Sequence, residues 1–147
     1  MILLRPSTRD ELVSFDKMDR QNHAKSFVTQ VGIEIHQKYY DNTDVTYLTI
    51  ENSNGEISGY FVLVTEADKG SLEFRRVLID QYKRGIGQAA ITEMENYCRE
   101  NFRVDRIWLD VYEDNEIGIH IYEKMGYRQF KAEREDGRKL LFYEKAL

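Results

Sequence analysis

The feature of this chain that most constrains its fold is a change in hydrophobic period near residue 85. Three runs before it, at 45–50, 57–64 and 72–79, are rich in β-branched and aromatic residues and are separated by polar turns. Such runs predict an antiparallel meander of strands. Beyond the change, apolar residues recur at helical spacing on one face: Ala90, Ile91, Met94, Tyr97 and Cys98. A meander of strands followed by amphipathic helices predicts a mixed α/β domain.

The remaining elements follow from the same patterns. A short strand is expected at 2–6, and a capping box at Thr8–Glu11 opens a first helix. Residues 21–40 are expected to form a second helical stretch. After the helix that starts near Gly87, the patterns predict a strand, a helix and two further strands: 106–111, 115–125, 128–132 and 140–144. Gly126 is expected to cap the last helix, and the turn at 135–137 to join the last two strands.

Length and composition narrow the class of protein. At 147 residues the chain is expected to form one domain over 1–147, and it has no run near the roughly 18 apolar residues of a membrane helix. A formal net charge of −5 argues against non-specific binding of nucleic acid and is compatible with a cationic substrate. The N-terminus lacks the features of a signal peptide. Cys98 is the only cysteine, so no intramolecular disulfide framework can form. We therefore expect a cytoplasmic protein without membrane contact.

The segment from Arg75 to Gln88 carries the most chemical information. A strand ends there, a basic turn follows, and Gly85 and Gly87 open a helix. Glycine allows the backbone to approach a ligand closely, and the first turn of a helix offers free N–H groups and a positive dipole end. Lys83 and Arg84 add positive charge beside it. Together these features predict a cradle for a pyrophosphate group, although a plain strand-to-helix turn with solvated basic residues has a similar sequence.

A dinucleotide-binding fingerprint is the competing interpretation of the same glycines. Gly85-x-Gly87-x-x-Ala90 matches its spacing, and Asp110 follows about 20 residues later at a strand end. The fingerprint normally begins where its strand stops, but residues 80–84 separate Gly85 from the last apolar residue of the strand. The preceding strands also form a hairpin meander rather than a βαβ unit, so this interpretation is disfavoured.

Three segments resemble the GNAT acyltransferase superfamily. Arg84-Gly85-Ile86-Gly87 corresponds to its glycine motif, Ile107 to Asn115 to its second strand and asparagine, and Ile121 to Tyr127 to its closing helix. The resemblance is specific from about Leu72 to Phe130. It implies a single GNAT-like domain with a mixed, largely antiparallel sheet of about seven strands, flanked on both faces by about four helices.

The resemblance also implies roles for particular residues. The backbone of Val77, Leu78 and Ile79 is expected to bind the pantetheine arm of acetyl-CoA. The helix start is expected to hold the pyrophosphate through Lys83, Arg84, Gly85, Ile86, Gly87 and Gln88. Asn115 is expected to cap the last helix, to contact the cofactor, or both, with Asp114 as the competing cap. Tyr122 is the candidate general acid, with a core tyrosine as the alternative. The sequence departs from the family at Tyr82, where a Gln or Arg is usual, and Gln81 stands one place earlier.

The base that must deprotonate the amine is expected to be Glu73. Strict alternation places Glu73 on the same face of its strand as Arg75, Val77 and Ile79. An ion pair with Arg75 or Arg76 is the alternative role. The histidines have no metal-ligand spacing, so no metal site is expected. Two roles are considered for three aromatic residues, which either line a substrate cleft or pack against the strands: Tyr39, Tyr40 and Tyr47.

These observations predict an N-acetyltransferase that moves an acetyl group from acetyl-CoA to a primary amine by direct attack, without a metal. A polyamine, an aminoglycoside-like amine, an amino acid or a protein amine remain open as acceptors. A non-catalytic module that binds acyl-CoA as a sensor or partner is the alternative. The family resemblance also implies a possible homodimer.

Overall fold

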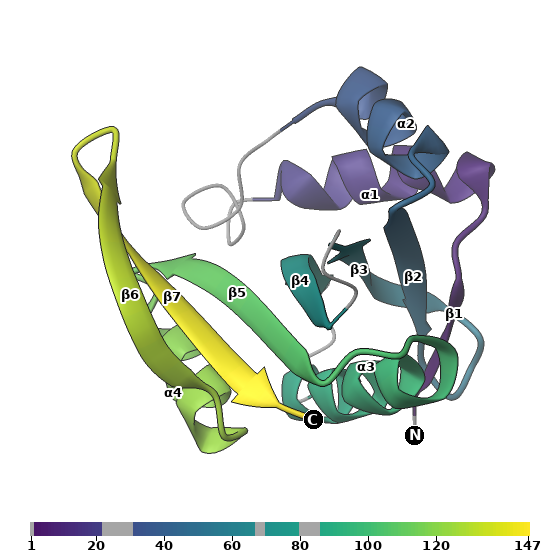
Figure 1. Ribbon diagram of the computed structural model, residues 1–147. Coiled ribbons are helices and arrows are strands. Elements are labelled where there is room, and N and C mark those ends of the chain that lie inside the picture. The colour runs from purple at the N-terminus through teal and green to yellow at the C-terminus, as the bar shows by residue number, and fades with distance from the viewer. Residues whose placement is uncertain (1, 22–30, 67–69, 80–85) are drawn as a thin grey trace.

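The computed structural model describes residues 2–21, 31–66, 70–79 and 86–147. Its centre is one seven-stranded sheet in the order β1-β2-β3-β4-β5-β7-β6 (Figure 1). The strands are β1 (Leu3–Pro6), β2 (Val45–Glu51), β3 (Ile57–Thr65), β4 (Ser71–Ile79), β5 (Arg106–Tyr112), β6 (Arg128–Glu135) and β7 (Arg138–Ala146). Neighbouring strands are antiparallel except for β4 and β5, which are parallel. The predicted mixed, largely antiparallel sheet is therefore confirmed.

Four helices cover the two faces of this sheet. They are α1 (Leu12–Asp19), α2 (Ile33–Asp41), α3 (Gly87–Asn101) and α4 (Glu116–Lys124), and a short 3-10 turn, Arg9–Glu11, precedes α1. In Figure 1, α1 and α2 lie together on one side of the sheet and α3 lies on the other. The apolar faces of α3 and α4 pack on the larger core, and those of α1 and α2 on a smaller one. None of these described helices is long and apolar enough to cross a membrane.

The larger core contains the apolar face that the sequence predicts for α3. Ala90, Ile91, Met94 and Cys98 are all buried there against the strands. Residues from alternate positions of β5 and β7 complete it: Ile107, Leu109, Val111, Leu141 and Tyr143. Because side chains of a strand alternate between faces, the intervening residues of β5 must face the side of α1 and α2.

Turns at the ends of elements agree with the sequence in most places. The hairpin between β2 and β3 turns at Gly55 (φ 78°), and that between β6 and β7 at Asp136 (φ 52°) and Gly137 (φ 77°). Gly126 follows α4 with a φ of 96°, which confirms it as the residue that ends this helix. Glu11 accepts a hydrogen bond from the N–H of Thr8 at 2.8 Å, as the capping box predicts.

Three predicted elements have other boundaries in the structure. Of the stretch 21–40 expected to be helical, the described part is helical only in α2, from Ile33 to Asp41, and Gly32, with a φ of 84°, precedes it; residues 22–30 lie outside the described residues. The last two strands are longer than predicted, since β6 and β7 pair all the way to the turn. Their polar outer residues gave no hydrophobic signal, because every residue of β6 is exposed.

Candidate functional site

The two parallel strands β4 and β5 part in the middle of the sheet. Their pairing covers only three positions and ends at Glu73 opposite Trp108. Beyond that point β4 continues to pair with β3 on its other side. In the described part of the chain, residues 74–78 therefore have no strand partner on the β5 side. Backbone N–H and C=O groups at such an edge are available to a ligand, because a backbone polar group without a hydrogen-bond partner is energetically unfavourable.

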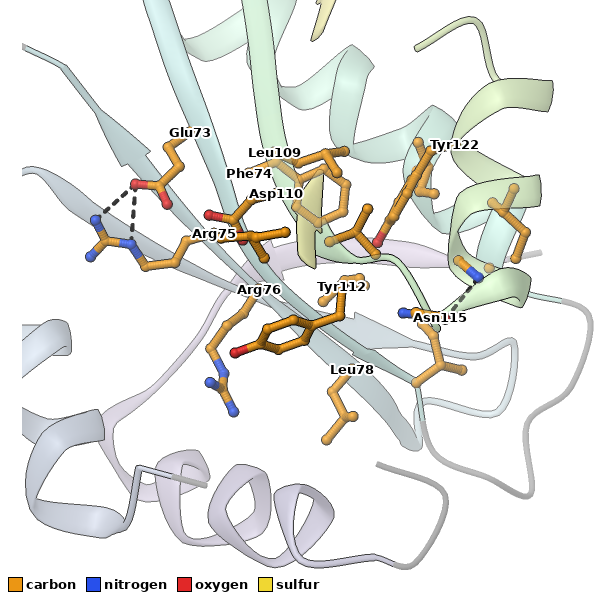
Figure 2. A pocket seen from close by; sticks show the side chains of 18 of the residues that line it. Glu73, Phe74, Arg75, Arg76, Leu78, Leu109, Asp110, Tyr112, Asn115 and Tyr122 are labelled. Atoms are coloured by element: carbon orange, nitrogen blue, oxygen red, sulfur yellow. Dashed lines mark hydrogen bonds and ion pairs between the residues drawn. The ribbon is translucent and has the colours of Figure 1, made fainter. Parts of the chain in front are cut away.

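A cavity of about 630 Å³ lies at this parting of the strands (Figure 2). Its walls come from β4, β5, the starts of α3 and α4, and the tip of the β6–β7 hairpin. The residues that line it include Glu73, Phe74, Arg75, Arg76, Val77, Leu78, Ile79, Gly87, Asp110, Tyr112, Asn115, Gly118, Tyr122 and Glu135. Most of the described residues that the sequence predicted for the site therefore surround one space.

The start of α3 forms one end of the cavity. Ile86 is the residue before the helix, and Gly87 is its first residue and lines the cavity. Gln88 is exposed in the first turn. The first N–H groups of a helix have no partner within it, and α3 is 15 residues long, so its dipole favours an anion at this end. Lys83, Arg84 and Gly85, predicted for the same cradle, lie outside the described residues.

The start of α4 forms a second part of the wall. Asn115 caps the helix, and its Oδ1 accepts a hydrogen bond from the N–H of Gly118 at 2.9 Å. A Cβ at position 118 would lie 2.8 Å from Asn115 Nδ2, so a larger residue there would require the Asn115 side chain to shift. Asn115 rather than Asp114 is thus the cap, and Asp114 instead binds Arg138.

Tyr122 reaches the cavity from the buried face of α4. Its side chain is 9% exposed and packs edge-on against Phe74 and Tyr127, with ring centroids 5.9 and 6.2 Å away. Figure 2 shows its hydroxyl pointing into the cavity, and no group among the described residues hydrogen-bonds it. Burial, with a smaller effect from the charge of Asp110, raises the pKa of Tyr122 to about 12. The phenol therefore remains protonated at neutral pH.

Glu73 lies on a different face of β4 from the one predicted. Val62 pairs with Arg76 but Leu63 pairs with Phe74, so Arg75 is an extra residue that forms a β-bulge. Phe74 and Val77 consequently share the face of the larger core, whereas Glu73 and Arg76 share the face of α1 and α2. The prediction that Glu73 shares a face with Val77 and Ile79 was wrong, because a bulge reverses the alternation.

The alternative role of Glu73 is present in the structure. Its Oε1 accepts two hydrogen bonds from Arg75, at 2.8 and 3.2 Å. Arg76 does not join this pair; its guanidinium points toward α1, where it lies 3.1 Å from the buried carboxylate of Asp19. Glu73 lines the cavity with one oxygen already engaged.

Asp110 is a cavity residue that the sequence interpretation did not assign to this site. It lies on β5 between Leu109 and Val111, which both point into the larger core, so its side chain faces the side of Glu73. Its side chain is exposed and forms part of the concave wall of the cavity. Desolvation by that wall raises its pKa to about 6; Glu73, Glu135 and Glu133 add to the rise, and Arg75 opposes it. The signal in the sequence was a lone acid among apolar strand residues.

Of the three candidate aromatic residues, only Tyr39 lines the cavity. Tyr47 is buried, and its hydroxyl lies 2.7 Å from His36 Nδ1. Tyr40 donates a hydrogen bond to the carbonyl oxygen of Ser7 at 3.2 Å. Tyr47 therefore attaches α2 to β2, and Tyr40 attaches it to the segment after β1; neither forms a substrate surface.

A cluster of Asp16, Asp19 and His36 brings three possible metal-binding side chains within 4.8 Å, which the sequence spacing did not suggest. Asp19 accepts hydrogen bonds from Tyr60 and pairs with His36 Nε2 at 2.7 Å, besides its contact with Arg76. The guanidinium of Arg76, 3.1 Å from the carboxylate of Asp19, already supplies the positive charge that a metal ion would bring. This cluster is therefore a hydrogen-bonded network within the smaller core.

Comparisons with known proteins agree with this architecture. The model of the acetyltransferase (GNAT) family matches residues 12–127. The chain is 25% identical over 142 aligned residues to the N-acetyltransferase YdgE of Bacillus subtilis, which is named as uncharacterized; the match covers 84% of this chain and 90% of that protein.

Solved structures show the same fold at low sequence identity. Spermidine N-acetyltransferase from Vibrio cholerae, in complex with CoA and spermine, superposes with a TM-score of 0.86 at 16% identity, over 99% of this chain and 95% of that one. The aminoglycoside acetyltransferase AAC(6')-Ib in complex with coenzyme A gives 0.83 at 18% identity, with the same coverage of each chain.

Proposed function

Because this chain belongs to the GNAT family of acetyltransferases, we propose that it transfers the acetyl group of acetyl-CoA to a primary amine by direct attack. The observation that carries the proposal is the parting of β4 and β5 around a cavity, with Tyr122 on one side and two carboxylates on the other. No covalent intermediate on the enzyme is needed, since the amine itself attacks the thioester carbonyl.

The donor acetyl-CoA is proposed to bind along the open edge of β4. Backbone groups of Val77, Leu78 and Ile79 would hydrogen-bond the amide groups of its pantetheine arm. Its pyrophosphate would lie at the start of α3, at Ile86, Gly87 and Gln88, together with Lys83, Arg84 and Gly85. Asn115 would contact the arm from the other wall. The support is that Val77, Leu78, Ile79, Gly87 and Asn115 all line the cavity, and that Ile86 and Gln88 flank Gly87 at the start of α3.

Tyr122 is proposed to act as the general acid. When the C–S bond breaks, the thiolate of CoA must gain a proton, and a phenol close to the sulfur can donate it. Two observations support this role: the hydroxyl points into the cavity, and it has no hydrogen-bond partner among the described residues. Its raised pKa, about 12, keeps the proton in place until the thiolate forms.

The acceptor is proposed to be a small cationic amine. Arg75 pairs with Glu73 and Arg76 with Asp19, so among the described residues the charge left facing the cavity comes from Asp110 and Glu135. A negatively charged cavity attracts ammonium groups. The named substrates of the similar structures, spermidine and an aminoglycoside, are amines of this kind and are the first to test.

The test is calorimetric titration with acetyl-CoA, with NADP and ATP as controls, followed by release of CoA thiol with a panel of amines. The proposal expects micromolar binding of acetyl-CoA alone and steady thiol release with at least one amine. Binding without transfer to any amine would favour the non-catalytic acyl-CoA-binding module instead. Absence of binding by folded protein would contradict both.

A further inference from the structure

The candidate acid and the candidate bases of the cavity lie on opposite faces of the sheet. Tyr122 enters from the face of α3 and α4. Glu73 and Asp110 lie on the face of α1 and α2, because their strand neighbours point into the larger core. Figure 2 shows the two carboxylates together across the cavity from the tyrosine hydroxyl. An amine that approaches between α1, α2 and the sheet would therefore meet carboxylates before it meets the thioester.

The two carboxylates differ in their hydrogen bonds and ion pairs. Glu73 accepts both hydrogen bonds of the Arg75 guanidinium on one oxygen, within a single strand. Among the residues that the structure describes, no donor hydrogen-bonds Asp110 and no cation forms an ion pair with it. An ammonium group entering the cavity can thus bind Asp110 without displacing a partner, whereas at Glu73 it would compete with Arg75.

We propose that Asp110, rather than Glu73, accepts the proton that the acceptor ammonium loses before attack. This assignment rests on the acetyl transfer proposed above. Asp110 takes one proton from R–NH₃⁺ and becomes a carboxylic acid, and the neutral amine forms the C–N bond to the acetyl carbon. The C–S bond breaks, the thiolate takes the proton of Tyr122, and the second proton of the amine nitrogen leaves to solvent. Asp110 then releases its proton to water, and Tyr122 regains one.

The electrostatic surroundings of Asp110 suit this role. Its pKa of about 6 lies close to neutral pH, so the group is largely ionised there and still has useful affinity for a proton. The charged groups that influence it are Glu73 and Arg75 of β4, and Glu133 and Glu135 of β6. From α4 it faces Tyr122, and its neighbour on β7 is the uncharged Phe142. Glu73, with Arg75, is thereby assigned a role in setting the pKa of Asp110 rather than in taking the proton.

The test compares Asp110→Asn with Glu73→Gln, each assayed over pH 5–9 with two acceptors: one amine that is protonated at pH 7 and one of low pKa that is already neutral. Asp110→Asn is expected to lower kcat/KM about 100-fold or more for the protonated amine and far less for the neutral one. It should also remove the acidic limb near pH 6. Glu73→Gln should retain that limb. Acetyl-CoA binding, measured by calorimetry, should be unchanged in Asp110→Asn, which shows that the variant is folded.

Three results would overturn the assignment: an acidic limb that persists in Asp110→Asn, an equal loss for both amines, or a limb that disappears only in Glu73→Gln. If the wild-type protein binds acetyl-CoA but transfers its acetyl group to no amine, the proposed function itself fails, and the role of Asp110 fails with it. Wild-type activity combined with any of the three results rejects Asp110 alone.

Discussion

At the scale of single residues, the site depends on side chains whose environment differs from that of water. Tyr122 is a phenol enclosed by aromatic rings, with its hydroxyl at the cavity. Asp110 is a carboxylate on a concave wall beside other carboxylates. In both cases desolvation favours the neutral form, and at Asp110 the neighbouring carboxylates add to it, which raises the pKa. The two groups are thereby suited to opposite tasks, one to hold a proton and one to accept it near neutral pH.

The replacement Tyr122→Phe tests the first of these tasks. It removes the hydroxyl but keeps the ring contacts, and no hydrogen bond among the described residues is lost. We expect kcat to fall about 100-fold, in the range typical of general acids, with the Kd of acetyl-CoA almost unchanged. Stopped-assay kinetics and calorimetry measure the two quantities. An unchanged kcat would assign Tyr122 to the core alone.

At the scale of secondary structure, the cavity exists because β4 keeps its contact with β3 while it leaves β5. Gly59 of β3 makes this contact possible: a Cβ there would lie 2.1 Å from the carbonyl oxygen of Leu78 and 3.1 Å from Ile79 Cα. The bulge at Arg75 then decides which side chains of β4 face each helix pair. Backbone fit, more than side-chain chemistry, therefore shapes the wall proposed for pantetheine.

Gly59→Ala should accordingly damage both stability and binding. The added methyl group meets backbone atoms, which cannot rotate away, so β3 and β4 must separate. We expect a loss of about 1–3 kcal/mol in the free energy of unfolding, measured with urea, and weaker binding of acetyl-CoA. Gly70→Ala is the matched control at the other end of β4, because among the described residues its Cβ would meet only Asp105 Oδ1, at an ordinary 3.5 Å. Equal effects of the two changes would contradict this account.

The junction of β1, the 3-10 turn and β2 gives a prediction about acid. Glu11 accepts hydrogen bonds from Arg5, which lower its pKa from 4.5 to about 2, with further support from the N–H of Thr8 and the hydroxyl of Thr49. A folded-state pKa below the unfolded one means that the stabilisation is complete above pH 4.5 and is lost as the pH falls to about 2.

Replacing Glu11 with Gln should therefore lower the melting temperature at pH 7. The gap between variant and wild type should narrow steadily between pH 4.5 and about 2, because the wild-type carboxylate is then being protonated. Glu93→Gln, at an exposed position of α3, is the control and should show no such narrowing. A constant gap over this pH range would refute the role assigned to Glu11. Thermal melts across this pH range measure the difference in melting temperature.

At the scale of the whole molecule, a buried polar network attaches α1 and α2 to the sheet. Asp19 is fully buried and contacts Tyr60 of β3, Arg76 of β4 and His36 of α2. His36 in turn reaches Tyr47 of β2. Arg76 belongs both to this network and to the cavity wall, so the position of the helices and the shape of the acceptor side are coupled.

Asp19→Ala should be strongly destabilising, because it leaves the guanidinium of Arg76 buried without its carboxylate. A loss of about 3–5 kcal/mol in the free energy of unfolding is expected for one partner of a buried pair, and Asp19→Ala combined with Arg76→Met should recover part of it. Asp16→Ala is the control: its partner Arg20 is 55% exposed, so a loss below about 1 kcal/mol is expected. Urea unfolding of five proteins, with the wild type and Arg76→Met alone included, tests the coupling. Strict additivity in the double variant would argue against it.

Local sequence determined most of the elements of this protein. The period of α3, the turn at Gly55 and the termination of α4 at Gly126 depend on residues a few positions apart, so they were predicted correctly. The positions of Tyr122 and Asn115 followed from the family resemblance, and the structure places both at the cavity. Where polar residues hid the pattern, as in β6, only the start of the strand was predicted.

Tertiary structure decided which residues meet. The bulge at Arg75 arises from the register between β3 and β4, and it moved Glu73 to the other face of its strand. Asp110 became a cavity residue because β5 parts from β4 after Trp108, which no local pattern reveals. Asp19, His36 and Arg76 form one network from distant parts of the chain. Periodicity reports the conformation of a segment, whereas register and strand separation follow from the packing of the whole sheet, and the proposed chemistry depends on those.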